Sequence, residues 1–418
     1  MLSAKAALAR CLQATLPVLA ERVSLDLAFD RVLAEPIVSP LNVPPWDNSA
    51  MDGYAVRACD VQQSGVTLRV LETIAAGAVP KNEVVEGTCA RIMTGAPIPR
   101  GADTVIMVER TSTSEDMRSV TLHERPSPGQ NVRPLGGDVR KGQRVLEPGT
   151  VLTPAAVALI SSLGIPSVLV AQKPRVAILS TGDEVVPPGF PKTAGQIYGS
   201  NTLALIGLVR QAGAEPVHCG IAPDDPQGLR DALQRCLRCD LILTTGGVSV
   251  GDFDHVKDVM GGVDFWKVAI KPGKPLAFGD LEGVPFFGLP GNPVSCMVNF
   301  LQFVRPVIRQ SLGDPKPYLP VVPATLTHPL RKKPGRAHLS RVMLRRDGQR
   351  WLATPTATQS SGVLMTMVLA DGLTLLPPDA GDQPEGAELL VQLIRPDWGR
   401  AEDPQYPWDH DPLHDHGC

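Results

Sequence analysis

The sequence predicts a multidomain protein in which a central α/β domain with a mostly parallel sheet is joined to β-rich regions on both sides. The chain has 418 residues and 43% hydrophobic content, enough for several separate cores. Between residues 174 and 312, short apolar runs alternate with helical patterns, which is the arrangement of βαβ units. Outside this region, short strand-like runs are separated by turns, and the 41 prolines and 39 glycines supply those turns.

The central region divides into expected strands at 175–180, 215–221, 240–245, 263–270 and 285–289, and expected helices at 200–211, 226–238 and 293–312. In a parallel sheet, the C-terminal ends of the strands lie along one edge, where ligands bind. Several strand ends here carry chemically capable residues: TGDE at 181–184, Asp224 with Asp225, the loop 246–254, and LPGNP at 289–293. The sequence therefore predicts a site at that edge.

The stretch LILTTGGVSVGDFD (241–254) is the most informative of these strand ends. Gly246, Gly247 and Gly251 leave backbone N–H groups uncovered, which suits a phosphate or another oxyanion. Asp252 and Asp254 add hard oxygen ligands of the kind that divalent cations bind. An anion-binding backbone beside carboxylates indicates phosphate chemistry.

The flanking regions have their own expected elements. A helix at 3–16, capped by Ser3, precedes a proline-rich extended stretch at 36–45. Residues 66–121 predict a β-rich lobe, 141–151 a hairpin, and 153–163 a helix with Thr153 as its cap and Pro154 at its first position. Strand-like runs at 321–330, 338–344, 351–356 and 388–393 predict a small barrel or sandwich.

Polar stretches in the first third of the chain allow two interpretations. WDNSAMDGYAVR (46–57) is either an Asx-rich turn leading into a strand, or a site if the fold carries Asp52 to the glycine loop. Thr94, in MTGAP, follows a strand and is either an anion contact or part of a turn. Arg133 lies in a polar loop, where a guanidinium could grip an oxyanion.

Lysines at the end of another expected strand are also open to two interpretations. Lys267 and Lys271 lie in FWKVAIKPGKP, with Lys274 close behind. They are either solvated surface charges or the cations that balance an anionic substrate.

Composition argues against some classes of protein. A net charge of −3 and 4% aromatic residues argue against nucleic acid as the main partner. No apolar run approaches the length that spans a bilayer, so no membrane partner is expected, and residues 1–20 fit an amphipathic helix better than a signal or transit peptide. Eight scattered cysteines indicate a reduced, intracellular protein, and the expected location is the cytoplasm.

The CxxC stretch and the C-terminal tail each allow two interpretations. Cys236 and Cys239 form a lone CxxC in a helical stretch, which favours buried structural thiols over zinc binding or redox work. The tail at 397–418 is expected to be disordered, with a weak metal site built from its histidines as the alternative.

Seven stretches, in chain order, resemble a known family. WDNSAMDGYAVR, RIMTGAP, GQNVR, LSTGDE, GGVSVGDFD, FWKVAIKPGKP and GLPGNPVS closely resemble the molybdopterin molybdenumtransferases, the MoeA-type enzymes related to the E domain of gephyrin and of its plant counterpart. The resemblance runs from the N-terminus to about residue 394 and leaves only the tail uncovered.

The resemblance implies an elongated homodimer of four-part subunits. Its parts are a discontinuous stalk and dimerisation domain at 1–45 and 140–173, a β-rich lobe at 46–139, a molybdopterin-binding α/β domain at 174–318, and a C-terminal β-barrel-like domain at 319–396. In the family, the active cleft is shared between the α/β domain of one subunit and the N-terminal lobe of the other.

The resemblance also implies a reaction. The substrates are molybdate and adenylylated molybdopterin, and Mg²⁺ or another divalent cation assists hydrolysis of the pyrophosphate bond with release of AMP. A transient contact with the molybdopterin adenylyltransferase is implied as well. The alternative functions are that adenylyltransferase activity itself and a non-catalytic scaffold of the gephyrin type.

The resemblance carries roles over to matching residues. The catalytic set is Asp52, Asp138, Glu184, Asp224, Asp254, Lys267 and Lys271, and the metal ligands are Glu184, Asp224 and Asp254. The substrate-binding set is Thr94, Arg133, Gly246, Gly247, Ser249, Pro290, Pro293 and Ser361. The sequence leaves open which of Asp224 and Asp225 points inward, and Asp252 stands where relatives commonly have Glu.

Overall fold

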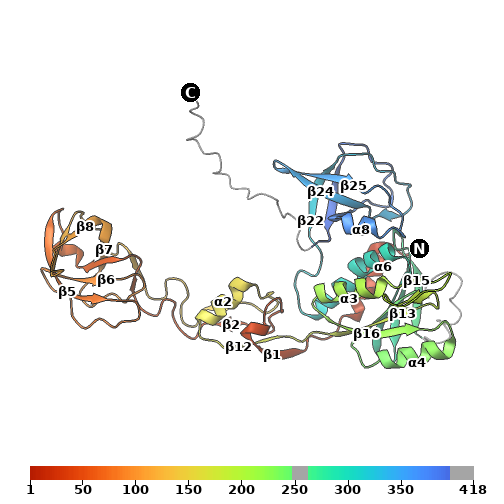
Figure 1. Ribbon diagram of the computed structural model, residues 1–418, viewed down its shortest axis with the longest axis horizontal. Coiled ribbons are helices and arrows are strands. Elements are labelled where there is room, and N and C mark those ends of the chain that lie inside the picture. The colour runs from red at the N-terminus through yellow and green to blue at the C-terminus, as the bar shows by residue number, and fades with distance from the viewer. Residues whose placement is uncertain (247–261, 396–418) are drawn as a thin grey trace. The chain divides into compact units, whose positions relative to one another are not determined.

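The computed structural model describes residues 1–246 and 262–395 of the chain (Figure 1). These residues form two compact units. The smaller unit is Glu21–Val170, and the larger unit combines Met1–Ala20 with the chain from Ala171 onward. The expected stalk segment 1–45 is therefore divided between the two units at Ala20.

One part of the smaller unit is a six-stranded sheet in the order β7-β4-β6-β5-β9-β8. Its two faces carry separate apolar clusters, one around Tyr54, Ile106 and Leu122 and the other around Ile74 and Ile92. This sheet confirms the predicted β-rich lobe. Its strands are β4 (Gly53–Val56), β5 (Val66–Ile74), β6 (Thr88–Ile92), β7 (Thr104–Met107), β8 (Thr111–Thr113) and β9 (Ser119–Leu122).

The rest of the smaller unit is built from segments far apart in the sequence. Strand β1 (Ala20–Ser24) pairs with β12 (Ser167–Ala171), and β2 (Ile37–Val38) pairs with β11 (Arg144–Leu146). Helix α2 (Pro154–Ser162) packs in the apolar cluster that forms the core of this part of the unit. The Thr153 hydroxyl caps the helix by accepting from Ala156 N–H, as predicted.

The hairpin predicted at 141–151 is wrong. Strand β11 pairs antiparallel with β2 instead of with a neighbouring segment. The physical reason is burial, since Leu146 packs in the same apolar cluster as Ile37, and a local hairpin would forgo that contact.

The larger unit contains the α/β domain. Its sheet has the order β16-β13-β17-β21-β20-β18, and all the pairings from β16 to β21 are parallel, which confirms a mostly parallel sheet. The strands are β13 (Arg175–Thr181), β16 (Glu215–Ala222), β17 (Leu241–Thr245), β18 (Val263–Lys267), β20 (Pro275–Leu281) and β21 (Val284–Leu289), with the short pair β14 (Val185–Val186) and β15 (Ile197–Tyr198) beside them.

Helices cover both faces of this sheet, as Figure 1 shows for α3 and α4 beside β13 and β16. Helix α4 (Pro226–Cys236) packs Leu229 and Leu233 onto one face. Helix α3 (Asn201–Gln211) lies on the other, where the hydroxyls of Ser180 and Thr202 are 2.6 Å apart. Cys236 and Cys239 are buried in the apolar cluster under α4, as predicted.

Strand β20 was not predicted. It pairs antiparallel with both β18 and β21. The turn into β21 passes through Glu282 and Gly283, both with positive φ, a backbone conformation suited to a tight hairpin. The sequence pattern did not separate this strand from the preceding PGKP turn.

The helix predicted at 293–312 is interrupted. It consists of α6 (Pro293–Asn299), a π-helical segment (Phe300–Val304) and α7 (Arg305–Ser311). Pro306 has no N–H to donate to the preceding turn, which explains why the regular α-helical pattern is not maintained there. Helix α1 (Ala4–Cys11) packs against this π-helical segment and is capped by the Ser3 hydroxyl, as predicted.

The C-terminal region closes into a barrel in the order β22-β25-β24-β26-β27, which settles the choice between barrel and sandwich. Val342, Ala353 and Val391 fill its core. Strand β23 (Ala337–His338) pairs in parallel with β19 (Ile270–Lys271) of the α/β domain, so the barrel is joined to that domain by backbone hydrogen bonds. The barrel strands are β22 (Val321–Leu326), β24 (Arg341–Asp347), β25 (Arg350–Pro355), β26 (Gly372–Thr374) and β27 (Glu388–Leu393), and α8 (Met365–Leu369) lies beside β24.

Within residues 1–246 and 262–395, no helix combines the length and the apolar character that crossing a membrane would require. The C-terminal stretch expected to be disordered lies outside the described residues.

Candidate active site

The ends of neighbouring parallel strands meet at one edge of the α/β sheet, as predicted. Asp183 follows β13 and Asp224 follows β16. The Asp183 N–H donates to Asp224 Oδ2 at 3.3 Å, and the Asp224 N–H donates to Asp183 Oδ1 at 3.2 Å. This reciprocal pair holds the two strand ends together and places exposed carboxylates beside each other.

The structure distinguishes Asp224 from Asp225. Asp225 is the N-cap of α4, and its Oδ1 accepts from the N–H groups of Gln227 and Gly228 at 3.1 and 2.8 Å. Its carboxylate is therefore committed to the helix start. Of Asp224 and Asp225, Asp224 is therefore the residue whose carboxylate belongs to the strand-end cluster.

Gly246 lies where β17 meets β13. Its φ is +94°, and a Cβ at this position would come within 2.7 Å of the Thr181 carbonyl oxygen. Any larger residue would therefore push the two strand ends apart. The Thr181 hydroxyl is buried and has no hydrogen-bond partner among the described residues. Glu184 folds back over Gly182, where a Cβ would collide with its carboxylate.

Asn201, at the start of α3, connects two of these strand ends. Its Nδ2 donates to Thr245 Oγ1 at 2.7 Å and to the Gly291 carbonyl at 2.8 Å. Thr245 ends β17, and Gly291 lies in the LPGNP turn after β21, in which Pro290 is buried and Pro293 opens α6. The Asn201 side chain therefore fixes the spacing between the end of β17, where Gly246 follows Thr245, and the LPGNP turn.

A cationic cavity of about 580 Å³ adjoins the LPGNP turn, and we name it the Lys271–Ser361 pocket. The barrel domain closes one side of it, because Val294 N–H donates to the Ser361 carbonyl at 3.2 Å. The lining residues are Lys271, Pro272, Gly273, Lys274, Pro275, Asn292, Ser295, Arg336, Gln359, Ser360 and Ser361. Two lysines, an arginine and three serine hydroxyls suit an oxyanion.

Two predicted residues, Lys271 and Ser361, thus line the same pocket, and a third predicted residue, Lys267, does not. Lys267 lies opposite Pro275 in the β18–β20 pairing, with an exposed side chain that does not line the pocket. Sequence reasoning missed Arg336 and Ser295. The signal for Arg336 was its place in KKPGR, a basic run ahead of a predicted strand.

A buried arginine holds the barrel side of this pocket. Arg341 is fully buried, and its Nη2 donates to the carbonyls of Thr358 and Ser360 at 3.4 and 3.1 Å. Gln359 exchanges two further hydrogen bonds with the Arg341 backbone. No carboxylate pairs with the guanidinium among the described residues, and burial lowers its pKa to about 10.

A second predicted cluster lies in the smaller unit. Asp52 Oδ1 accepts from both the N–H and the hydroxyl of Thr94, each at 2.7 Å. These two hydrogen bonds, the backbone bond first, lower the pKa of the Asp52 carboxyl. The rest of the Asx-rich turn is structural, since Asp47 Oδ1 accepts from Leu135 N–H at 2.6 Å.

Arg133 belongs to the same group of loops. Its strand β10 (Val132–Arg133) pairs antiparallel with β3 (Asn48–Ser49), in the Asx-rich turn. The Gly95 N–H in MTGAP donates to the Ser49 carbonyl at 2.8 Å. Asp52, Thr94 and Arg133 therefore stand on three hydrogen-bonded loops. Asp138 is exposed, donates its N–H to the Val43 carbonyl, and has no described hydrogen bond to these loops.

The remaining predicted residues, Gly247, Ser249, Gly251, Asp252 and Asp254, lie outside the described residues. Among the described residues, no group of three His, Cys, Asp or Glu side chains is placed to hold a metal ion. Glu184 and Asp224 supply carboxylate oxygens at the strand-end cluster, which is the donor type that a divalent cation takes.

Family comparisons match this architecture along nearly the whole described chain. The MoeA N-terminal region (domain I and II) matches residues 2–164, a probable molybdopterin binding domain matches 177–310, and the MoeA C-terminal region (domain IV) matches 323–394. The fold and the strand-end site thus define a multidomain protein organised around an α/β domain of the molybdopterin-binding type.

Individual relatives belong to the same family as these matches. The chain is 41% identical to a molybdopterin molybdenumtransferase from Haemophilus influenzae, over 91% of this chain and 95% of that protein. It is 40% identical to molybdopterin molybdenumtransferase 2 of Mycobacterium tuberculosis, over 88% and 94%. A crystal structure of a molybdopterin biosynthesis MoeA protein from Pyrococcus horikoshii matches with a TM-score of 0.82 and 32% identity, covering 94% of this chain and all of that one. The chain belongs to the molybdopterin molybdenumtransferase, or MoeA, family.

Proposed function

We propose that this protein takes molybdate and adenylylated molybdopterin, hydrolyses the pyrophosphate bond, releases AMP and places molybdenum on the pterin dithiolene. The observation that carries the proposal is the Lys271–Ser361 pocket, which adjoins the glycine-lined strand ends through the LPGNP turn. A tetrahedral oxyanion and a phosphate-bearing pterin are the ligands that such neighbouring sites suit.

Molybdate binds in the Lys271–Ser361 pocket in this proposal. Lys271, Lys274 and Arg336 neutralise its charge, and Ser361 contributes a hydroxyl. These groups are donors that hold an oxyanion without attacking it. Lys267, at the end of β18, acts on the approaching anion from outside the pocket.

The adenylylated pterin binds along the strand ends. Gly247 and Ser249 would offer backbone N–H groups to phosphate, and Pro290 and Pro293 shape the neighbouring wall. Gly246 does not share this role, because its N–H donates to the Leu289 carbonyl at 3.2 Å, contrary to the expectation that it is uncovered. The buried, unpartnered Thr181 hydroxyl is one further polar group available to this ligand.

Mg²⁺ or another divalent cation belongs to this proposal, with Glu184, Asp224 and Asp254 as the residues that would hold it. When bound, such a cation polarises phosphoryl oxygens. The chain's own contribution is to keep Asp224 available, because Asp225 is the residue that caps α4.

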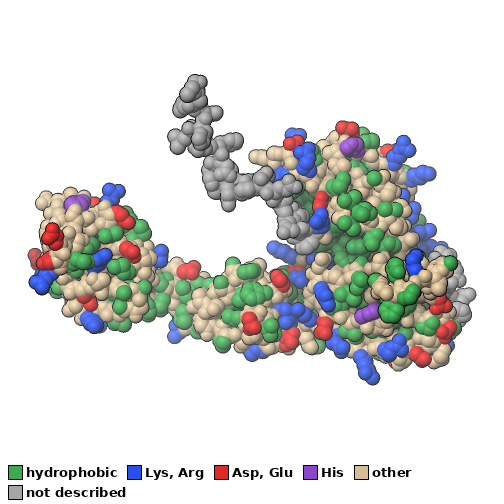
Figure 2. Space-filling model, in the orientation of Figure 1, with side chains coloured by type: hydrophobic (Ala, Val, Ile, Leu, Met, Phe, Trp, Pro, Cys, Tyr) green, Lys and Arg blue, Asp and Glu red, His purple; other side chains and the backbone are tan. Residues whose placement is uncertain are grey.

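We further propose a cytoplasmic homodimer with the stalk, lobe, α/β and barrel divisions at 1–45 with 140–173, 46–139, 174–318 and 319–396. The loops that carry Asp52, Thr94 and Arg133, with Asp138, would come from the partner subunit, and a transient contact would deliver substrate from the adenylyltransferase. Exposed Leu203, Met365 and Val368, each more than 60% exposed, support a surface that a second copy covers. Figure 2 shows hydrophobic side chains on this surface of the larger unit.

The test is a single-turnover assay with purified protein, adenylylated molybdopterin, molybdate and Mg²⁺. AMP release should require molybdate, and Lys274→Ala should raise the molybdate concentration needed without unfolding the protein. Arg345→Ala, which removes an exposed charge from the barrel strand β24, is the matched control. Synthesis of adenylylated molybdopterin from ATP and free molybdopterin would instead identify an adenylyltransferase, and absence of both activities would identify a scaffold.

A further inference from the structure

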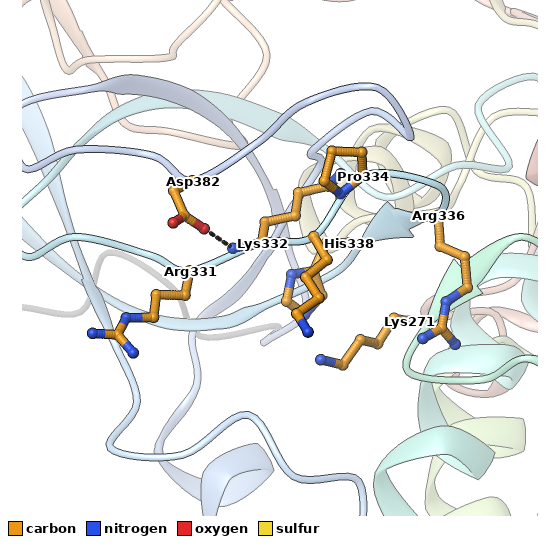
Figure 3. Close-up of a pocket in the computed structure, with 8 residues that line it drawn as sticks. Lys271, Arg331, Lys332, Pro334, Arg336, His338 and Asp382 are labelled. Carbon is orange, nitrogen blue, oxygen red and sulfur yellow. Dashed lines mark hydrogen bonds between the residues drawn. The ribbon is translucent and has the colours of Figure 1, made fainter.

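A second concave surface of the larger unit is strongly cationic, and most of the residues that line it have no role in the proposed reaction. This cavity, which we name the basic pocket, has a volume of about 370 Å³ and is lined by Lys271, Arg331, Lys332, Lys333, Arg336 and His338. Of the described residues that line it, Asp382 is the one acid. Figure 3 shows Arg331 and Arg336 on opposite sides of the pocket, with His338 between them.

The backbone around the basic pocket is held by hydrogen bonds on both sides. Lys332 N–H donates to Asp382 Oδ1 at 2.6 Å, and Gly335 N–H donates to the Pro378 carbonyl at 2.7 Å. His338 lies on β23, which pairs with the β19 residue Lys271. The cations are therefore presented by a fixed frame and not by a free loop.

One lysine of this set belongs to the frame. Lys332 is 4% exposed, and its Nζ donates to the carbonyls of Pro378 and Ala380 at 3.1 and 2.6 Å. Its neighbours in the sequence, Arg331 and Lys333, are exposed. The extended chain turns alternate residues to opposite sides, so anchoring Lys332 inward directs Arg331 and Lys333 outward.

The other cations lack partners. Lys271, Arg331, Lys333 and Arg336 make no ion pair in the part of the chain that the structure describes. His338 is 3% exposed, and neither of its ring nitrogens has a hydrogen-bond partner there. Burial lowers the pKa of His338 to about 4, and the neighbouring charges, with Lys271 first, act in the same direction.

A solvated cationic surface is the ordinary explanation for clustered lysines and arginines. Three observations distinguish the basic pocket from such a surface: the cations line a cavity, their backbone is anchored, and a buried imidazole beside them is left without a partner. Concave arrangements of one sign of charge concentrate counter-ions, and buried polar side chains are normally hydrogen-bonded.

We infer that the basic pocket is a second oxyanion-binding site, which takes a doubly charged tetrahedral oxyanion or the phosphate group of a small molecule. Arg331 and Lys333 bind the anion from the barrel side, and Lys271 and Arg336 bind it from the side next to the Lys271–Ser361 pocket. Because Lys271 and Arg336 line both cavities, the two sites adjoin and share donors. The inference does not depend on the proposed reaction, since binding alone defines it.

The binding test is isothermal titration calorimetry with molybdate, inorganic phosphate and AMP at fixed ionic strength. Wild-type protein should bind molybdate at two sites. The double variant Arg331→Ala with Lys333→Ala should lose at least about tenfold in affinity at one of them, because two charge-assisted contacts are removed. The three ligands distinguish a site for free oxyanions from a site for a nucleotide phosphate.

The matched control is Arg345→Ala with Arg346→Ala, which removes the same charge from exposed positions on β24 of the same barrel. Equal affinities in the two double variants, whether unchanged or equally reduced, would overturn the inference, because they would leave only an effect of net charge. Asp382→Asn should act in the opposite direction and tighten binding, since it removes the acid but retains an oxygen for Lys332 N–H. Weaker binding in that variant would also contradict the inference, provided that its melting temperature is unchanged.

Discussion

One carboxylate oxygen of Asp52 accepts hydrogen bonds from both the backbone N–H and the side-chain hydroxyl of Thr94, each at 2.7 Å, across 42 residues of sequence. The contact ties the Asx-rich turn to the MTGAP loop. It also keeps the Asp52 carboxyl in its charged form, because both donors stabilise the anion. An exposed acid is thereby given a fixed position and a fixed charge.

Replacing Thr94 by Val should raise the pKa of Asp52. The substitution conserves the side-chain shape and the backbone donor but removes the hydroxyl donor. The measurement is a carboxyl ¹³C NMR titration of Asp52 in wild type and variant. Thr67→Val, at an exposed hydroxyl pair on β5, is the control and should leave the titration unchanged. An identical Asp52 titration in Thr94→Val would mean that the backbone donor alone sets its charge.

Asn201→Ala should loosen the strand-end cluster. The variant removes two hydrogen bonds, to Thr245 and to the Gly291 carbonyl, and leaves both partners short of a donor, at a cost of about 1–3 kcal/mol in unfolding free energy. Substrate affinity should fall as well, because the LPGNP turn is no longer held at a fixed distance from the end of β17. Denaturant unfolding and pterin-substrate binding measure the two effects.

Gln211→Ala, at the exposed C-terminal end of the same helix, controls for the loss of a polar side chain from α3. If Asn201→Ala lost stability but bound substrate with unchanged affinity, the residue would have only a structural role, and the link between the two strand ends would not matter for binding.

Local signals in the sequence were sufficient for much of the fold. Ser3 and Thr153 were predicted as helix caps and are caps, because capping depends on residues three positions apart. The parallel strands of the α/β sheet were also predicted, since their continuous apolar runs are typical of strands buried on both faces. The sharing of one sheet edge by TGDE, Asp224 and Gly246 follows from parallel order alone.

Long-range partners could not be predicted in this way. The pairing of β19 with β23 joins residues more than 60 positions apart, and an apolar pattern does not specify which strand meets which. That pairing, with the contact of Val294 and Ser361, is what places Lys271, Arg336 and Ser361 around one cavity. The roles of these residues and of Asp52, Glu184 and Asp224 in catalysis remain predictions.

Arg341→Met should release the pocket wall without greatly changing stability. The guanidinium is buried, and no carboxylate among the described residues pairs with it, so removing its charge offsets the loss of its hydrogen bonds. The unfolding free energy should therefore change by no more than about 2 kcal/mol. The loop at 358–361 should nevertheless lose its anchor. Hydrogen exchange at the Ser360 and Ser361 amides should accelerate, and molybdate affinity should fall.

Arg345→Met, at an exposed position on the same strand, is the control for that variant. Arg341→Lys should behave like Arg341→Met in the exchange experiment, because the lysine side chain is shorter and its ammonium would not reach the two carbonyls that Arg341 Nη2 contacts. Wild-type exchange rates in Arg341→Met would show that Gln359 alone holds the loop.

His338 should make the folded protein less stable in mild acid. The pKa of an unperturbed histidine is about 6.5, and burial among cations lowers the pKa of His338 to about 4 in the folded state. Between these values the unfolded chain binds a proton at this residue and the folded chain does not, so stability falls as the pH decreases from about 7 to 4. The loss amounts to about 3 kcal/mol over that range.

His338→Gln removes the titrating group, so its unfolding free energy should decrease less than that of the wild type between pH 7 and pH 4, measured by denaturant unfolding in buffers without multivalent anions. Above pH 7 the difference between the two proteins should be independent of pH, because His338 is then neutral in both states. His328→Gln, at an exposed histidine of the same barrel, should follow the wild type, since that ring keeps its contact with water on folding. Parallel curves for the wild type and His338→Gln would mean that His338 takes up its proton while folded, which requires an anion or an acid beside it.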